Sequence, residues 1–449
     1  MQERSKPERR TNLTASNRNN ASWDFSESLD VLTRRYAASG EPVTVNFRDM
    51  VPIAPGSDRA THLIHPYPAK LLPNIPLYFA NCKQLSHAGD LVLDPFCGTG
   101  TVLLEAILAG RRTAGSDANP LARLITKVKL CRMDAADVES AFEWTMSAAR
   151  TSRPLDFSPV VKVDHWYSRK TARELGKIIS AINQLPEGPS REFLRVSFSS
   201  CVKRASHADP RLSVPVRKKG VDVNEGLGAS EVRAMFARVV TTNIDRLARF
   251  NSMVSAVNSD SYIGQDARDF RPIAEEKAEL VITSPPYNSA QKYIRSSSLS
   301  IGWLGLAPNN KLRTLERLSI GREHFDRADY SLPIDSVVPE AEEVLNRVRQ
   351  KSPLRAHIAA TYLQEMQSAL SATVAAMKPG GHFVLVIGNN TIAGEPFHTE
   401  RYISTMLRNA GLTSRLELID DIRSRGLMTK RNKTAGLITQ EHIHVLQKG

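Results

Sequence analysis

The sequence predicts an α/β fold in which a mostly parallel sheet is interrupted by two insertions. Two strand–turn–helix units follow one another between residues 90 and 130, and short connections of this kind produce parallel strands with right-handed crossovers. Further apolar strands recur only after residue 260, so distant parts of the chain complete the sheet. The chain has 449 residues, against the ~150 of one typical domain, which leaves room for insertions.

The first strand covers 90–94 and turns through a glycine-rich loop into the apolar helix 101–109, which Gly110 ends. A second strand covers 112–117. Asn119 and Pro120 are then a typical N-cap and first residue of another helix. These elements predict that residues 46–130 form the first part of the core domain. Residues 1–45 are mostly polar and predict a flexible lead-in.

The rest of the sheet is expected near the carboxyl terminus. Apolar strands are predicted at 279–283 and 382–388, a helix at 356–377, and another helix near 398–410. The segments 414–419 and 441–446 are expected to form a closing antiparallel pair. The predicted parts are therefore a helical insertion at 131–260, core at 261–294, a second insertion at 295–355, and core at 356–449.

Composition excludes several classes of protein. Hydrophobic residues make up 41% and charged residues 24%, a globular balance that excludes wholesale disorder. No stretch reaches the ~18 apolar residues of a membrane-spanning helix, and the polar first ten residues do not resemble a secretion signal. The four cysteines (Cys82, Cys97, Cys131 and Cys201) form no CxxC pair, so we expect neither a zinc ribbon nor a disulfide framework. A cytoplasmic location is expected.

The glycine-rich loop is Asp94-Pro-Phe-Cys-Gly-Thr-Gly100. Glycines let the backbone turn sharply and approach a ligand closely. Asp117, at the tip of the next strand, can bind both hydroxyls of a ribose. A dinucleotide loop has a third glycine where this chain has Leu103, which disfavours a pyrophosphate. The loop therefore indicates a nucleoside cofactor without a pyrophosphate, and S-adenosylmethionine is the obvious candidate. A plain strand–helix turn is the alternative.

A second loop, Thr283-Ser-Pro-Pro-Tyr287, follows the strand 279–283. The carboxyl ends of parallel strands are where open α/β sheets bind ligands. The two prolines fix the backbone, so the Ser284 hydroxyl and the Pro285 carbonyl can point at one small target. Tyr287 offers a flat face for stacking on a base. An ordinary polyproline loop is the alternative interpretation.

Together the two loops resemble those of the nucleic-acid amino-methyltransferases, which transfer a methyl group from S-adenosylmethionine to an exocyclic amine. The stretch His65-Pro-Tyr-Pro-Ala-Lys70 precedes the glycine loop as the extra cofactor-side motif of that family does. Gly264-Gln-Asp-Ala-Arg-Asp269 stands at the third strand. The resemblance covers about 60–130, 260–294 and 360–449, and it implies a Rossmann-like methyltransferase with a mostly parallel seven-stranded sheet.

The resemblance also implies site residues. Cofactor binding is implied for Asp94, Phe96, Gly98, Gly100, Asp117, Asp266, Tyr67 and Lys70, and catalysis for Ser284, Pro285, Pro286 and Tyr287. Acceptors in the second loop would bond the amine hydrogens and free the nitrogen lone pair. Proximity and oriented dipoles would supply most of the catalysis, without a metal. The target base would have to be flipped out of the duplex, with Tyr287 stacking on it.

A serine at the head of the second loop is most similar to the DNA cytosine-N4 enzymes, whereas adenine-N6 enzymes more usually have Asp there. We therefore expect methylation of cytosine N4 in double-stranded DNA, in restriction–modification or a related defence system, with a cognate nuclease as a candidate partner. Three alternatives stay open: an adenine-N6 enzyme, an RNA guanine-N2 enzyme, and a DNA-binding protein with an inactive methyltransferase fold. A cytosine-C5 enzyme is not expected, because no cysteine has the required position and Cys97 is interpreted as a small packing residue.

Basic segments are the candidates for phosphate contacts, and the net charge of +13 favours a polyanionic partner. Residues 199–219 hold six basic residues and one acidic residue. The predicted DNA contacts are Lys203, Arg204, Arg217, Lys218 and Lys219. The helical insertion 131–260 is therefore a candidate for DNA contacts, and the second insertion, 295–355, is a candidate for target recognition. Residues 421–433 form a second basic segment, and a solvated loop is the alternative for either one. His442 and His444 alternate along the last strand and are interpreted as strand-face residues, not metal ligands.

Overall fold

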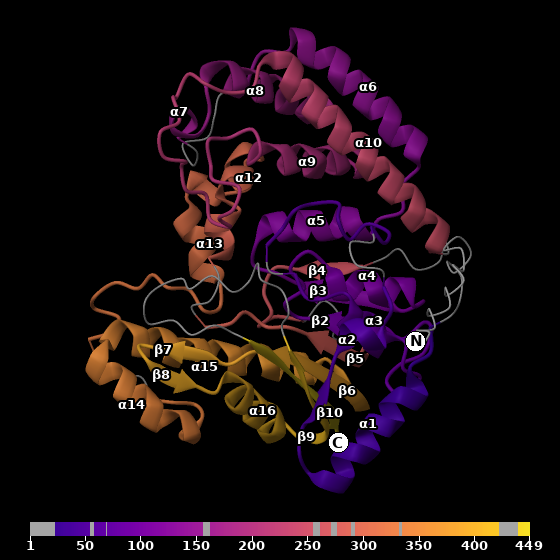
Figure 1. The fold of residues 1–449 in the computed structure, drawn as a ribbon, viewed down its shortest axis with the longest axis vertical. Helices are drawn as coiled ribbons and strands as arrows, with labels where there is room; N and C mark the ends of the chain where they lie inside the picture. Colours follow the sequence, from indigo (N-terminus) through magenta and orange to yellow (C-terminus); the bar gives the residue numbers. More distant parts are fainter. Residues whose placement is uncertain are drawn as a thin grey trace, which may run out of the picture.

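The computed structural model describes residues 23–53, 58–68, 70–155, 162–254, 261–270, 276–288, 292–331, 335–421 and 439–449. Its centre is an eight-stranded sheet with the order β1-β9-β10-β6-β5-β2-β3-β4 (Figure 1). All neighbouring strands are parallel except β10, which runs antiparallel to β6 and β9. The strands are β1 (Val43–Val45), β2 (Leu91–Asp94), β3 (Arg112–Ser116), β4 (Tyr262–Gly264), β5 (Ala278–Thr283), β6 (Met377–Ile387), β9 (Leu412–Asp421) and β10 (Gln440–Lys448).

The predicted fold class is confirmed, including the closing antiparallel pair of β9 and β10. The sheet has one strand more than the predicted seven, because β1 pairs with β9 and places Val43 opposite Leu418. The lead-in predicted over 1–45 is corrected from residue 23 onward. Helix α1 (Ser26–Ser39) lies there because Leu29 and Leu32 are buried in the same hydrophobic cluster as Val43. The polar composition of this segment did not indicate that it contains a short amphipathic helix.

Helices cover both faces of the sheet. Alternate strand residues point to opposite faces, so Val92 and Leu280 pack with α1, α2 (Phe47–Met50) and α3 (Asn74–Ala80). Leu93 and Val281 pack on the other side with α14 (Glu342–Lys351), α15 (Pro353–Ala375) and α16 (Thr399–Asn409). Helices α4 (Thr101–Leu108) and α5 (Pro120–Leu130) follow β2 and β3 in the two units predicted from the sequence.

The insertion predicted over 131–260 is helical throughout its regular elements and packs above α5 (Figure 1). Its helices are α6 (Ala135–Thr151), α7 (Val163–Trp166), α8 (Arg169–Gln184), α9 (Pro189–Val202) and α10 (Ala229–Met253). Buried side chains of these helices share one hydrophobic cluster with Leu121 and Ile125 of α5. The insertion is therefore continuous with the cofactor half of the core.

The second insertion packs against both the helical insertion and the sheet. Its elements are α11 (Tyr293–Ser296), α12 (Ser298–Trp303), α13 (Leu312–Leu318), the 3-10 turns at Pro308–Asn310 and Pro339–Ala341, and α14. Trp303 is buried in the cluster of the helical insertion, whereas Val344 is buried in the cluster on the sheet. A two-stranded hairpin, β7 (Asn390–Ile392) and β8 (Glu395–Phe397), follows β6. None of the described helices is both long and apolar enough to cross a membrane.

Candidate active site

The glycine-rich loop leaves the end of β2 and enters α4. Gly98 and Gly100 have φ angles of +52° and +71°, a region that favours glycine. A Cβ at Gly100 would stand 2.8 Å from Cγ2 of Thr126 on α5, so packing also requires glycine there. A Cβ at Gly98 would meet no atom within 4 Å. Open space therefore adjoins the loop at Gly98, where a ligand can approach the backbone.

Asp94 connects the glycine loop to the second loop. Its Oδ1 accepts hydrogen bonds from the Thr283 hydroxyl at 2.7 Å and from the Phe96 amide at 3.1 Å. Because β5 pairs with β2, with Leu93 opposite Val281, both loops leave the same edge of the sheet. Burial raises the pKa of Asp94 to about 7, although these two hydrogen bonds act in the opposite direction. Asp94 thus fixes the two loops relative to each other.

Asp117 follows β3 and lies beside the glycine loop. Its carboxylate accepts from the amides of Gly98 at 3.1 Å and Asn119 at 2.7 Å. Burial raises its pKa to about 6, while these amide bonds and nearby Arg123 favour the ionised form. A carboxylate next to the open space at Gly98 has the acceptors that a ribose diol needs. These residues therefore fit S-adenosylmethionine.

The segment that contains Tyr67 and Lys70 packs against the start of α5. Asn119 caps that helix by accepting from the Leu121 amide at 3.0 Å, and its Nδ2 donates to the Tyr67 hydroxyl at 2.9 Å. Burial raises the pKa of Tyr67 well above its ordinary value, and the charge of Asp117 adds to the effect. Tyr67 therefore lies near the predicted ribose site.

Lys70 holds the shape of its own segment. Its Nζ donates to the carbonyls of His62 at 3.2 Å and His65 at 2.6 Å. Burial lowers the pKa of this ammonium to about 8, and Arg246 contributes to the shift. Direct contact of Lys70 with the cofactor remains a prediction.

The helical insertion supports the same segment from the other side. Asn243 of α10 donates to the Ile64 carbonyl at 3.1 Å, and His65 Nε2 lies 2.9 Å from Ser199 Oγ on α9. All four residues are buried. The insertion therefore positions the cofactor-side motif, a role that its sequence position did not predict.

Asp266 follows β4, and Arg268 binds its carboxylate. Nε of Arg268 lies 2.8 Å from Oδ1 of Asp266, and Nη2 lies 2.8 Å from Oδ2. Nη1 of Arg268 lies 3.4 Å from Oε1 of Glu365 on α15. Burial raises the pKa of Asp266, but the bonds from Arg268 outweigh it and leave the pKa below its ordinary value. Cofactor binding by Asp266 stays a prediction. Its carboxylate is already paired with the Arg268 guanidinium.

The second loop begins directly after β5. Pro285 is buried, whereas Ser284, Pro286 and Tyr287 are half-buried. The neighbouring Ser284 hydroxyl acts to lower the pKa of the Tyr287 phenol. Burial raises the pKa of Tyr287 well above its ordinary value. The loop therefore presents two hydroxyl groups and an aromatic ring at the sheet edge that also carries Asp94.

Distant segments lie around this loop. The Asn288 carbonyl, directly after Tyr287, accepts from Asn390 Nδ2 at 2.6 Å. Gly321 of the second insertion is adjacent, and a Cβ there would be 3.7 Å from the Tyr287 carbonyl oxygen. Glu441 of β10 is also a neighbour, and the Tyr287 phenol acts to lower its pKa. The β7–β8 hairpin thus holds the end of the loop, with the second insertion and β10 beside it.

The predicted DNA contacts in 199–219 divide into two kinds. Lys203 Nζ donates to the Leu212 carbonyl at 2.5 Å, and Arg217 Nη2 donates to the Val221 carbonyl at 3.0 Å, so these two side chains hold their own loop together. The side chains of the second kind are exposed and belong to Arg204, Lys218 and Lys219. Of the five predicted contacts, only these three side chains are available to bind phosphates. Of the other basic segment, 421–433, all residues after Asp421 lie outside the described residues.

Sequence reasoning missed Glu441 as a site residue and gave Asn119 only the role of a helix cap. The alternation along β10 contained a signal for Glu441. It shares a strand face with Ile443 and Val445, both of which are buried in the cluster under the sheet. A carboxylate that ends an apolar strand face at the functional edge of a sheet is an exception that points to the site.

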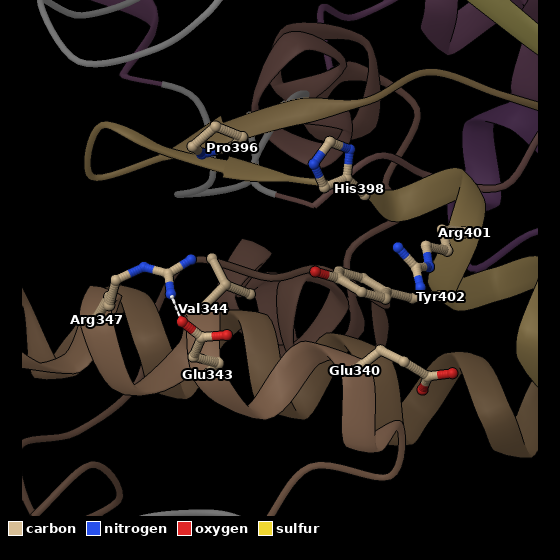
Figure 2. Close-up of a pocket in the computed structure, with 8 residues that line it drawn as sticks. All are labelled: Glu340, Glu343, Val344, Arg347, Pro396, His398, Arg401 and Tyr402. Atoms are coloured by element: carbon tan, nitrogen blue, oxygen red, sulfur yellow. Dashed lines mark hydrogen bonds and ion pairs between the residues drawn. The ribbon is translucent and has the colours of Figure 1, made fainter.

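A hollow of about 260 Å³ lies between α14, β8 and the start of α16 (Figure 2). Arg347 and Glu343 of α14 form an ion pair within it. Its lining residues are Glu340, Glu343, Val344, Arg347, Pro396, His398, Arg401 and Tyr402. None of the predicted cofactor or catalytic residues lines this hollow, so it is separate from the site described above.

The sheet order brings the glycine loop, the acid after β3 and the proline-containing loop to one edge. Open α/β sheets bind their ligands at this edge, and the three features are those that the resemblance assigns to an S-adenosylmethionine-dependent methyltransferase. Residues 62–127 match the family model described as DNA methylase. The predicted resemblance to the DNA amino-methyltransferases is thereby confirmed, and S-adenosylmethionine is the cofactor.

Individual relatives agree with this class. The Type II methyltransferase M.MvaI of Kocuria varians is 21% identical over 401 residues, which span 83% of this chain and 87% of the relative. The Type II methyltransferase M.MjaII of Methanocaldococcus jannaschii is 40% identical over 73 residues, 16% of this chain and 13% of the relative. A tRNA (guanine(10)-N2)-dimethyltransferase of Methanothermobacter thermautotrophicus is 45% identical over 51 residues, 11% of this chain and 15% of the relative.

Among solved structures, the rRNA methyltransferase aviRa from Streptomyces viridochromogenes aligns with 90% of this chain and 96% of its own, at 11% identity and a TM-score of 0.35.

Proposed function

We propose that this protein methylates the exocyclic N4 amine of cytosine in double-stranded DNA. The observation that carries the proposal is the position of Ser284. A hydrogen bond of 2.7 Å from Thr283 to Asp94 joins the residue before Ser284 to the first residue of the glycine-rich loop 94–100, called the cofactor loop below. An amine bound at Ser284 is therefore next to the cofactor loop, within one sheet edge.

The chemistry of the amine explains what the loop contributes. Cytosine N4 is a poor nucleophile because its lone pair is delocalised into the ring. The Ser284 hydroxyl and the Pro285 carbonyl accept its hydrogens, which draws the nitrogen toward sp³ geometry and localises the lone pair. Bound S-adenosylmethionine supplies an electrophilic methyl group on a sulfonium. Orientation and fixed dipoles from this chain then account for most of the acceleration.

The target base must leave the duplex to reach Ser284, because a paired cytosine cannot enter a loop at the edge of a sheet. Tyr287, which is half-buried beside Ser284, offers the ring on which the flipped base stacks. Exposed Arg204, Lys218 and Lys219 are the proposed phosphate contacts. The Type II methyltransferase relative that spans 83% of the chain supports a restriction–modification setting.

Adenine N6 is the second candidate acceptor. Cytosine presents N3 beside its N4 amine and adenine presents N1 beside N6, so the same loop can bond either edge. A serine hydroxyl at position 284 accepts a weaker hydrogen bond than the carboxylate of the Asp form. The serine favours cytosine only through its family association. Pocket shape around the ring must share the decision.

The test is to incubate the protein with S-adenosylmethionine and duplex DNA, digest the DNA to nucleosides and identify methylated bases by mass spectrometry. N4-methylcytosine supports the proposal, and N6-methyladenine as the sole product contradicts the choice of base. Absence of methylated bases in DNA, with methylated guanine in RNA, contradicts DNA as the substrate. The control is Ser284→Ala, which should bind S-adenosylmethionine like the wild type and give little product.

A further inference from the structure

We propose that residues 207–218 form a hairpin that enters the major groove of the DNA, where the side chains of Leu212 and Val216 contact thymine methyl groups. This inference rests on the proposed function only in taking duplex DNA as the partner, and it does not depend on which base is methylated. The segment lies between α9 and α10 and is called the 207–218 hairpin below. The basic residues around it bind phosphates in the proposed function, and the hairpin itself is here assigned the contact with bases.

The 207–218 hairpin is a pair of antiparallel arms that lies outside the main sheet. Ala208 and Arg217 form an antiparallel bridge. Next to this bridge, the Asp209 amide donates to the Val216 carbonyl at 2.8 Å. Residues 210–215 connect the two arms and form the tip of the hairpin.

The tip is ordered by polar contacts from two sides. The Arg211 amide donates to Oδ1 of Asp209 at 3.0 Å, and the Arg211 guanidinium lies 2.6 Å from the other oxygen of the same carboxylate. From the end of α9, Lys203 Nζ donates to the Leu212 carbonyl at 2.5 Å. Because these contacts order the tip before a partner binds, little further conformational entropy is lost on binding.

Apolar side chains are exposed on this ordered segment. Leu212 is 42% exposed and Val216 is 49% exposed. Val223, just beyond the hairpin, is 42% exposed. A single exposed apolar residue is ordinary on a protein surface, whereas several that lie close together indicate a binding surface. The tip and its flank therefore have the character of a contact surface.

The charges around the hairpin identify the kind of partner. Arg204 precedes the hairpin, Lys218 and Lys219 follow its tip, and all three side chains are exposed. Asp209 is the one acidic residue in 199–219, and it already forms an ion pair. Cations before and after an apolar tip match the phosphates that border a groove of DNA. A polyanionic duplex therefore fits this surface better than an apolar protein face does.

The shape of the hairpin favours the major groove. That groove is about 12 Å wide and admits a two-stranded β-ribbon, whereas the minor groove is only about 6 Å wide. The five residues from His207 to Leu212 span at most about 18 Å when extended, which exceeds the major-groove depth of about 8.5 Å. The apolar group that base edges present in this groove is the thymine methyl. It is therefore the partner assigned to Leu212 and Val216.

The hairpin begins close to the cofactor side of the site. Helix α9, which leads into it, ends beside α12, where the ring centroids of Phe198 and Trp303 are 5.7 Å apart (Figure 1). The next residue, Ser199, has its Oγ 2.9 Å from Nε2 of His65 in the cofactor-side motif. DNA must lie over the site to present a flipped base. The hairpin therefore extends from a part of the insertion that bound DNA passes.

Several basic side chains of the second insertion are instead paired within the protein. Arg295 lies 3.7 Å from Glu316, and Arg313 lies 3.2 Å from Asp326. These pairs reduce the positive charge that the second insertion offers to phosphates. The charge distribution therefore assigns base contacts to the 207–218 hairpin.

The DNA for the test is obtained without turnover. Duplexes are selected from a random pool by binding to the wild-type protein with S-adenosylhomocysteine, the cofactor without its methyl group. The selected sequence should contain at least one conserved thymine. A selected sequence without one, or no preferred sequence at all, would overturn the proposal. A duplex that is bound in this way but not methylated with S-adenosylmethionine would contradict only the proposed function.

The main experiment measures the affinity of wild type, Leu212→Ala and Val216→Ala for the selected duplex and for duplexes in which one conserved thymine is replaced by deoxyuridine, which lacks only the methyl group. Burying the exposed 42% of Leu212 corresponds to about threefold to tenfold in affinity. Wild type should lose this factor when the contacted methyl is removed. Each variant should lose it on the normal duplex and lose no more on the matching deoxyuridine duplex. Unchanged affinities, or losses that multiply, would overturn the proposal.

Two controls separate base contacts from other effects. Val31 on α1 is 44% exposed, so Val31→Ala removes a comparable apolar side chain and should leave DNA affinity unchanged. The loss in Leu212→Ala should be the same at every salt concentration, because no phosphate contact is removed. A flatter salt dependence in this variant would assign its effect to the DNA backbone. A wild-type dimer that Leu212→Ala converts to a monomer with unchanged DNA affinity would assign the tip to a protein interface, and either result would overturn the proposal.

Discussion

The cofactor loop, 94–100, and the loop at 283–287 lie at one edge of the sheet. They differ in how far apart in the sequence their supporting residues are. Gly98, Gly100, Asp117 and Thr126, which shape the cofactor loop, all fall within about thirty residues of Asp94. The loop 283–287 and the adjoining Asn288, called the amine loop below, are held by hydrogen bonds from Asp94 and Asn390 and lie beside Gly321 and Glu441, four positions scattered over most of the chain.

The difference shows which site depends on the assembled fold. One strand–loop–helix–strand–helix unit places every group of the cofactor loop, so local folding is enough to shape it. The surroundings of the amine loop come from the second insertion, the β7–β8 hairpin and β10, which are distant in the chain. Substitutions in the two loops should therefore separate cofactor binding from methyl transfer.

The largest effect is expected from Tyr287→Ala. The change removes the stacking face, worth about 1–3 kcal/mol per base, so the rate of methyl transfer should fall by about 10- to 100-fold. S-adenosylmethionine affinity measured by calorimetry should stay at the wild-type value. Loss of cofactor affinity in this variant would mean that the two loops are not separable.

Asp117→Ala should do the converse. Loss of the carboxylate should weaken S-adenosylmethionine binding by about 1–3 kcal/mol, the cost of leaving hydrogen-bonding partners unpaired. Because the ionised form accepts from the ribose, wild-type affinity should also fall as pH drops below about 6, the pKa of Asp117. Calorimetry between pH 5 and pH 8 checks both statements. Wild-type affinity in the variant would contradict the role of Asp117.

The two glycines distinguish a packing requirement from a ligand requirement. Gly100→Ala brings a Cβ to 2.8 Å from Thr126 at a positive φ, so it should destabilise the fold by about 1–3 kcal/mol. Gly98→Val meets no protein atom at its Cβ and should lose less stability, but it occupies the open space and should weaken cofactor binding. Thermal unfolding and calorimetry on both variants test this division, which equal losses of stability would contradict.

The smallest effect concerns the basic segment. Lys218→Ala with Lys219→Ala should weaken DNA binding and flatten its salt dependence by about 0.9 log unit for each phosphate that is no longer neutralised. Lys203→Ala is the matched control, because its ammonium binds the Leu212 carbonyl and its removal should leave the salt slope unchanged. Binding isotherms at several salt concentrations measure the slopes. Equal slopes in wild type and the double variant would mean that the segment is a solvated loop that does not contact phosphates.

The sequence by itself determined the α/β class, both loops and the cofactor, because each depends on residues that are neighbours in the chain. Strand–turn–helix periodicity and the glycines of 94–100 follow local rules, and Ser284 to Tyr287 directly follows an apolar strand. The tertiary structure alone decided which residues serve the amine loop. Glu441 meets Tyr287 only because β10 enters the sheet antiparallel beside β6. The helical insertion supports Ile64 and His65 through Asn243 and Ser199 for the same reason. Local propensity carries no information about strand order or long-range packing, and those two features place these side chains.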